Sequence, residues 1–207
     1  MVRRREKIRK YINEYKWSDM LAMMRNSKAD PERCEADFRD RLVVITGATS
    51  GIGYHTARRF AGGGANLVCI NRNPEKSRAL RHEIETEFGV SCREILADMS
   101  RLDEVHRAGH ELVSLTTPID VLIHNAGLHL TRRSETVDGL ETVFVVNYLS
   151  SFVLNYLLLD KLRVEGLARI LLVNSEGHRF ASWGLRLDDM NWERRRYQGL
   201  RSYGSMT

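Results

Sequence analysis

VVITGATSGIG, residues 43–53, joins an apolar run to a glycine-rich turn. The run predicts a strand over Leu42–Thr46, and the residues after the turn are typical of a helix. A phosphate approaches the backbone closely only where side chains are absent, and a helix N-terminus supplies N–H groups with partial positive charge. The segment therefore predicts a pyrophosphate-binding site. Its candidate cofactor-binding residues are Thr46, Gly47, Ser50, Gly51, Ile52 and Gly53.

Beyond this turn, short apolar runs alternate with longer amphipathic stretches. Strands are predicted over Leu42–Thr46, Asn66–Ile70, Cys92–Leu96, Ile119–His124 and Ala168–Val173. Their continuous apolar character is typical of strands covered on both faces, as in a parallel sheet. The stretches between them, about residues 51–62, 74–88, 101–115 and 136–163, are long enough for crossover helices.

These elements predict an α/β fold with a doubly wound, Rossmann-type parallel sheet in the order 3-2-1-4-5. We assign residues 41–207 to this dinucleotide-binding domain and residues 1–40 to an N-terminal helical extension and linker. Open sheets of this kind bind ligands at the carboxyl ends of their strands. The candidate functional residues are therefore expected at those ends.

The N-terminal extension is strongly charged and carries one apolar stripe. Ile8, Tyr11, Ile12 and Tyr15 follow the i, i+3, i+4, i+7 spacing that predicts a helix. We interpret it as an extension packed on the main domain, because nearby glutamates weaken attraction to anionic lipid. Docking of this helix on a membrane surface or a partner is the alternative.

The composition narrows the class of protein. The formal charge of the 207-residue chain is +5, but its arginines are spread along the sequence, which indicates a basic surface and no nucleic-acid partner. Its three cysteines lack a close Cys-x-x-Cys pair, so we expect thiols in a reducing compartment and no metal site. The most apolar run, Phe152–Leu159, is far shorter than the roughly 20 residues of a membrane span. A cytoplasmic protein is expected.

Several motifs resemble those of the short-chain dehydrogenase/reductase family. TGATSGIG is similar to the family's nucleotide-binding turn, and HNAG at His124–Gly127 is similar to its Asn-Asn-Ala-Gly motif, with histidine replacing the first asparagine. ADMS around Asp98 and VVNYLSSF around Asn147 follow in the family's order. The resemblance implies that Asp98 contacts the adenine edge. It also implies that Asn125, Ala126 and Gly127 line the ribose.

The end of the second predicted strand indicates which dinucleotide is preferred. An acidic residue there would accept hydrogen bonds from a ribose 2′-OH, whereas an arginine pairs with a 2′-phosphate. The segment INRNPEK places Arg72 at this point with no adjacent acid. NADP(H) is therefore predicted over NAD(H), and the alternative is that Arg72 is an ordinary exposed arginine at a helix entrance.

Hydride transfer to a carbonyl also requires a proton donor and a group that holds the developing oxyanion. The resemblance implies that Tyr203 is the acid, that Ser175 orients the carbonyl and that Asn147 supports the proton relay. The segment between Ser175 and Tyr203 resembles the retinol-dehydrogenase-like branch of the family, many of whose members act on lipophilic carbonyls or alcohols. A small carbonyl or alcohol is thus the expected substrate.

One position departs from the family pattern. Four residues after the tyrosine, where the family has lysine, this chain has Thr207, which cannot lower the pKa of the Tyr203 phenol. Tyr197 and Arg201 form a Tyr-x-x-x-Arg pair, which we interpret as unrelated because arginine does not replace lysine in this role.

The chain is expected to end inside the first turn of the helix that carries Tyr203, as a fragment or as a shortened family member. The leading hypothesis is an NADP(H)-dependent oxidoreductase. The alternative is a catalytically impaired dinucleotide-binding or regulatory protein of the same fold. Pairing through the long helix is expected to give a homodimer or homotetramer.

Overall fold

The computed structural model describes residue 30 and residues 34–163, 168–175, 177–178 and 185–206. Within them, five strands form one parallel sheet in the order β3-β2-β1-β4-β5, so the predicted topology is confirmed. The strands are β1 (Leu42–Thr46), β2 (Asn66–Asn71), β3 (Cys92–Leu96), β4 (Val121–His124) and β5 (Arg169–Leu172). The N-terminal helix predicted around Ile8–Tyr15 lies outside the described residues.

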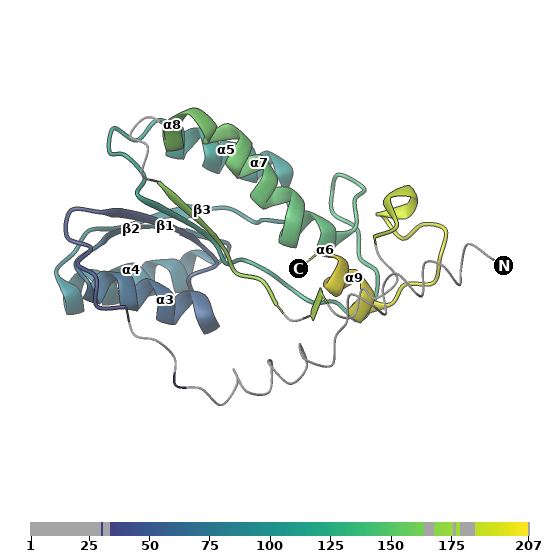
Figure 1. The fold of residues 1–207 in the computed structure, drawn as a ribbon, viewed down its shortest axis with the longest axis horizontal. Coiled ribbons are helices and arrows are strands. Elements are labelled where there is room, and N and C mark those ends of the chain that lie inside the picture. The colour runs from purple at the N-terminus through teal and green to yellow at the C-terminus, as the bar shows by residue number, and fades with distance from the viewer. Residues whose placement is uncertain (1–29, 31–33, 164–167, 176, 179–184, 207) are drawn as a thin grey trace.

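Helices cover both faces of the sheet (Figure 1). One face carries α3 (Gly51–Gly62) and α4 (Pro74–Phe88). The other carries α5 (Leu102–Val113), α7 (Ser150–Leu157) and α8 (Leu159–Arg163). None of the helices within the described ranges combines the length and apolar character that crossing a bilayer would need.

The long helix predicted over 136–163 begins later than expected. It starts with α6 (Thr142–Phe144), passes through a π-helical segment at Val145–Leu149 and continues into α7. The preceding residues form a turn instead, because Gly139 adopts a left-handed φ of 73° and the Glu141 side chain accepts a hydrogen bond from the Phe144 backbone N–H.

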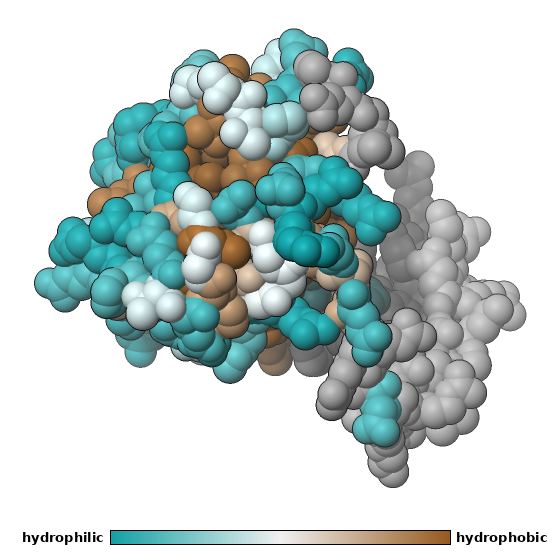
Figure 2. Space-filling view, turned by 90° about the vertical axis from the view of Figure 1, so that its left-hand side faces the viewer, coloured by the Kyte–Doolittle hydropathy of each residue, from teal (hydrophilic) through white to brown (hydrophobic). Residues whose placement is uncertain are grey.

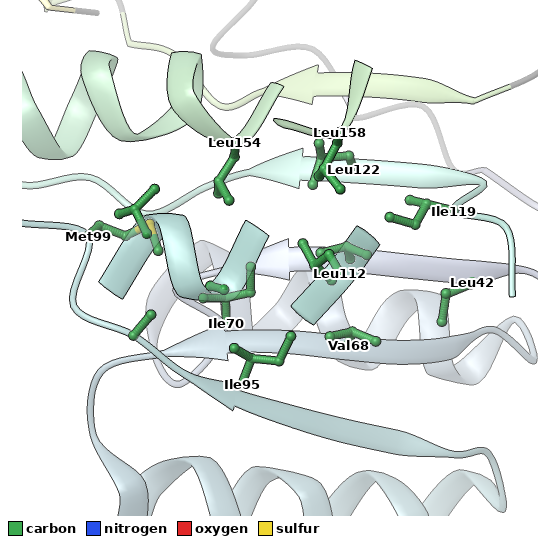
Figure 3. Close-up of a cluster of buried hydrophobic side chains, with 14 of the residues drawn as sticks. Leu42, Val68, Ile70, Ile95, Met99, Leu112, Ile119, Leu122, Leu154 and Leu158 are labelled. Carbon is green, nitrogen blue, oxygen red and sulfur yellow. The ribbon is translucent and has the colours of Figure 1, made fainter. Parts of the chain in front are cut away.

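The core lies on both faces of the central strands. All five residues of β1 are buried, and β2 and β4 are buried almost throughout. Figure 3 shows the cluster between the sheet and helices α5 and α7. Its labelled members are Leu42, Val68, Ile70, Ile95, Met99, Leu112, Ile119, Leu122, Leu154 and Leu158.

The prediction that every strand is covered on both faces was wrong for β5, whose four residues are all exposed, and in part for β3, where Arg93 and Leu96 are exposed. β5 is an edge strand that pairs only with β4 among the described residues, so its apolar side chains lack a neighbour on one side. The surface at the opposite end of the molecule from α9 (Gly199–Ser205) is largely polar, with apolar side chains gathered near its middle (Figure 2).

Candidate functional site

The glycine-rich turn after β1 is packed too tightly for side chains. A Cβ on Gly53 would overlap the Gly47 carbonyl oxygen and Asn125 Nδ2, and a Cβ on Gly47 would lie 3.0 Å from Ala126 Cα. Gly47 also has a φ of 71°, which L side chains rarely adopt. The backbone of the turn therefore lies directly at the N-terminus of α3 and packs against Asn125 and Ala126, which follow β4.

Side-chain hydrogen bonds hold this arrangement together. Asn125 Nδ2 donates to the carbonyl oxygens of Thr46 and Gly47 at 3.0 and 2.9 Å. Thr46 Oγ1 accepts from the backbone N–H groups of Asn125 and Ala126, both at 3.0 Å. Asn71, at the end of β2, accepts from the Ala48 N–H at 2.8 Å. The carboxyl ends of β1, β2 and β4 are thereby fixed relative to one another.

A cleft of about 770 Å³ opens at these carboxyl ends. All the predicted site residues line it except Thr46, which is buried behind the turn, and Gly51. The predicted residues that it brings together are Gly47, Ser50, Ile52, Gly53, Arg72, Asp98, Asn125, Ala126, Gly127, Asn147, Ser175 and Tyr203. The turn and the candidate catalytic residues thus share one cavity.

One end of the cleft is bounded by polar and charged groups after β2 and β3. The Arg72 guanidinium is largely exposed and lies 3.7 Å from the Asp98 carboxylate. Asp98 accepts hydrogen bonds from the backbone and hydroxyl of Ser100. Lys76, which the sequence prediction missed, also lines this end, and its backbone N–H is capped by the Asn73 side chain. The sequence could have indicated Lys76, because it lies in the same INRNPEK segment as Arg72.

Asn147 fixes the loop after β4 at the other end of the cleft. Its Oδ1 accepts from the Leu128 N–H at 2.9 Å, and its Nδ2 donates to the Leu128 carbonyl at 3.0 Å. The residue lies in the π-helical segment, a feature that is frequent at functional sites. Both ends of its amide are engaged by backbone, so the side chain ties the loop to the helix.

Ser175 and Tyr203 meet around Gly177. A Cβ placed on Gly177 would lie 2.5 Å from Tyr203 Cε1 and 3.3 Å from Ser175 Oγ, and Ser175 Oγ accepts a hydrogen bond from the Gly177 N–H. The Tyr203 ring also packs edge to face against His129, with ring centroids 5.5 Å apart. His129 lines the cleft, and no motif in the sequence indicated it.

Tyr203 lies further into its helix than expected. α9 begins at Gly199, so the prediction that the chain ends in the first turn of this helix was wrong. The earlier start depends on Gly199, because a Cβ there would overlap the Leu130 carbonyl oxygen, and on the burial of Ser202 and Met206.

Tyr197 occupies a different environment from Tyr203. Its hydroxyl donates to Glu141 Oε1 at 3.0 Å, and it does not line the cleft. Burial raises the pKa of Tyr197 to about 12, and the negative charge of Glu141 adds to this effect. Of the two tyrosines, Tyr203 therefore remains the candidate acid, because it lines the cleft and Tyr197 does not.

His124 replaces an asparagine of the resembled motif and is buried at the end of β4. Its Nε2 lies 2.8 Å from Asn155 Oδ1, and its Nδ1 has no hydrogen-bond partner among the described residues. Burial lowers the pKa of His124, which keeps the ring neutral in the folded protein at neutral pH. The substitution therefore links β4 to α7 by an uncharged hydrogen bond.

The parallel sheet and the glycine turn at the start of α3 are those of a Rossmann-type, dinucleotide-binding class of domain. A sequence profile described as short chain dehydrogenase matches residues 41–184. The chain belongs to this family, and its relatives place it in the retinol-dehydrogenase-like branch.

Human retinol dehydrogenase 13 is 33% identical over 172 residues, which cover 82% of this chain and 51% of that protein. The WW domain-containing oxidoreductase of Drosophila melanogaster is 40% identical over 153 residues, covering 70% of this chain and 36% of that protein. A short-chain dehydrogenase from Sphingobium yanoikuyae in complex with NADPH has a TM-score of 0.65 and 26% identity, covering 80% of this chain and 59% of that one. This chain thus spans about half the length of retinol dehydrogenase 13 and less of the fly protein.

Proposed function

We propose that this chain is the nucleotide-binding and catalytic part of an NADP(H)-dependent oxidoreductase that interconverts a carbonyl and an alcohol on a small lipophilic molecule. The observation that carries the proposal is that Ser175, Tyr203 and the Asn147-bound loop line the same cleft as the glycine turn. Family membership supports the same class of reaction.

The residues of the cleft fit a dinucleotide. Gly47 and Gly53 let the turn pack closely at the N-terminus of α3, whose free N–H groups suit a pyrophosphate, and a Cβ on Gly51 would meet no protein atom within 4 Å. Arg72 and Lys76 place two cations at the end of β2, where a ribose 2′-phosphate would lie. These two side chains support NADP(H) over NAD(H), and the bound NADPH of the Sphingobium relative agrees with that choice.

The residues around Gly177 suit general acid–base chemistry at a carbonyl. Bound NADPH would supply a hydride to the carbonyl carbon. Tyr203 would donate its phenolic proton to the developing alkoxide, and Ser175 Oγ would hydrogen-bond the same oxygen. Asn147 touches neither atom in this scheme but holds the Leu128 backbone that forms the neighbouring wall.

Two variants test the catalytic assignment. Tyr203→Phe keeps the ring contact with His129 but removes the acid, so turnover of an aldehyde and ketone panel should fall about 10²–10⁴-fold. NADPH affinity, followed by fluorescence titration, should stay within about twofold, because the phenol is needed for proton transfer. Turnover that survives both Tyr203→Phe and Ser175→Ala would contradict the proposal.

A third variant tests the choice of dinucleotide. Arg72→Ala removes a cation next to the 2′-phosphate, so NADPH should bind about tenfold more weakly while NADH affinity is unchanged. His106 is exposed on α5 and does not line the cleft. His106→Ala is therefore the control and should alter neither affinity. Equal losses for both nucleotides in Arg72→Ala would argue against NADP(H) preference.

Thr207 favours a second function, that of a dinucleotide-binding protein without turnover. The family places lysine at this position, and threonine carries no positive charge. Tight NADPH binding with no turnover across the substrate panel would support this function over the first.

We also propose that the chain self-associates through the outer face of its long helix. Tyr148, Phe152 and Tyr156 are 52%, 56% and 72% exposed and follow a four-residue spacing. Phe144, Tyr148 and Phe152 stack on one another, with centroid distances of 5.8 and 6.4 Å. Sedimentation of wild type and of Phe152→Glu should differ in oligomeric state, and two identical profiles would contradict this surface.

A further inference from the structure

Glu141 is a fully buried carboxylate at the start of the long helix, with an exposed fraction of 0%. Its Oε2 accepts from the Phe144 backbone N–H at 2.8 Å and from Ser202 Oγ at 3.3 Å. Its Oε1 accepts from the Tyr197 hydroxyl at 3.0 Å. In the part of the chain that the structure describes, no ion pair to lysine or arginine involves this carboxylate. Hydrogen-bond donors from separate segments satisfy it instead.

A buried carboxylate is costly unless its oxygens are satisfied, so each of these donors matters to the local structure. The backbone N–H of Glu141 is engaged as well, since it donates to Asn191 Oδ1 at 3.1 Å. The donors span about sixty residues of sequence. One side chain therefore ties the beginning of the long helix to the segment that ends in α9.

The two tied elements carry the candidate catalytic residues. α6, which Glu141 caps, leads directly into the π-helical segment with Asn147. Ser202 is the residue before Tyr203 in α9, and α9 packs beside α6 (Figure 1). A helix as short as α9 is not stable alone, so its position depends on contacts of this kind.

We propose that Glu141 is a positioning residue that fixes the Tyr203 phenol relative to the Asn147 helix through its hydrogen bond to Ser202. The inference rests on the proposed role of Tyr203 as the proton donor. Glu141 does not line the cleft, so it would contact neither a substrate nor a nucleotide bound there. Its effect is expected on the proton-transfer geometry and not on nucleotide binding.

The test compares Glu141→Gln with Glu135→Gln in the full chain. Glutamine keeps the shape of the side chain but removes its charge and replaces one acceptor oxygen with an amide NH2, so the hydrogen bonds that tie the two segments are weakened. Glu135 lies in the same turn, is half exposed and pairs with Arg133, which makes it the matched control. Ser202→Ala removes only the hydrogen bond between α9 and Glu141. This variant tests the positioning role if Glu141→Gln does not fold.

Three readouts are measured for each variant: hydrogen exchange of residues 199–206, NADPH affinity, and the separate values of kcat and KM for the substrate. For Glu141→Gln and Ser202→Ala we expect faster exchange in α9, a kcat about 100-fold lower and NADPH affinity within about twofold of wild type. Glu135→Gln should match wild type in all three.

Unchanged exchange in α9 and unchanged kcat in both test variants would overturn the inference. So would a loss of NADPH affinity that parallels the loss of kcat, because that pattern describes a merely structural carboxylate. If the wild type turns over no substrate, the proposed function fails by itself. Exchange in α9 still decides whether Glu141 positions the helix of Tyr203.

Discussion

Substituting Gly53 with alanine should damage both the fold and the nucleotide site. The new methyl group would overlap the Gly47 carbonyl oxygen and Asn125 Nδ2, and it would lie only 3.0 Å from the Gly47 carbonyl carbon. The first two contacts are backbone and a short amide that is itself hydrogen-bonded, so neither yields easily. Relief therefore requires the turn to move away from α3 or Asn125 to leave its place.

The size of the effect follows from these contacts. Overpacking costs about 1–3 kcal/mol, and losing the two Asn125 hydrogen bonds to Thr46 and Gly47 costs about 0.5–1.5 kcal/mol each. Alanine gains about 1 kcal/mol over glycine within a helix. The free energy of unfolding should fall by about 3 kcal/mol, which lowers the Tm by roughly 6–12 °C for a chain of this size.

Gly62→Ala is the matched control because Gly62 lies at the other end of the same helix. A Cβ there meets only the Phe88 ring, at 3.4 Å, so the variant keeps the gain in helix propensity without a backbone clash. Thermal unfolding and NADPH fluorescence titration are measured for both variants. Gly53→Ala should lose stability and bind NADPH at least tenfold more weakly, while Gly62→Ala should bind NADPH like wild type and unfold at the same or a slightly higher temperature. A Gly53→Ala protein that unfolds and binds like wild type would refute the tight packing of this turn.

Other predictions address the remaining contacts around the sheet. Asn147→Leu leaves both backbone groups of Leu128 unpaired, so chemical denaturation should show a loss of about 1–3 kcal/mol. Burial lowers the pKa of His124 below its ordinary 6.5, so the unfolded chain takes up the proton first and stability falls as the pH drops below 6.5. His124→Asn should flatten that part of the stability profile, and an unchanged slope would assign it to another group. Asp120→Ala removes the acceptor of the Leu42 N–H at 2.8 Å and should cost about 1–2 kcal/mol by thermal unfolding.

The sheet and its glycine turn could be predicted because their signals are local. Four of the five strands are short and largely apolar runs, and right-handed crossovers leave few possible orders for such runs. The turn is defined by glycines that fall between one strand and one helix. β5 shows the limit of this reasoning, because its apolar run looks like that of β4. Burial depends on which elements lie on either side of a strand, and the run itself does not carry that information.

The start of the long helix shows a related limit. Amphipathic spacing continues through residues 136–141, yet the chain turns there. The reason is a combination of Gly139 in the left-handed region and the Glu141 cap, which compete with the helix and are stabilised by contacts from distant residues. Tertiary contacts of this kind override the local helix propensity of the sequence.

The two ends of the cleft differ in how they are built, and this explains what the sequence could reveal about each. The nucleotide end is made by backbone at a strand–turn–helix junction and by side chains a few residues beyond a strand, all readable as short motifs. The reaction end depends on Tyr203, whose place is set by Gly177, Gly199 and the Glu141–Ser202 link. None of these contacts joins residues that are close in a recognisable motif. Motif resemblance could therefore indicate which tyrosine is the candidate acid, but only the fold shows what holds it in place.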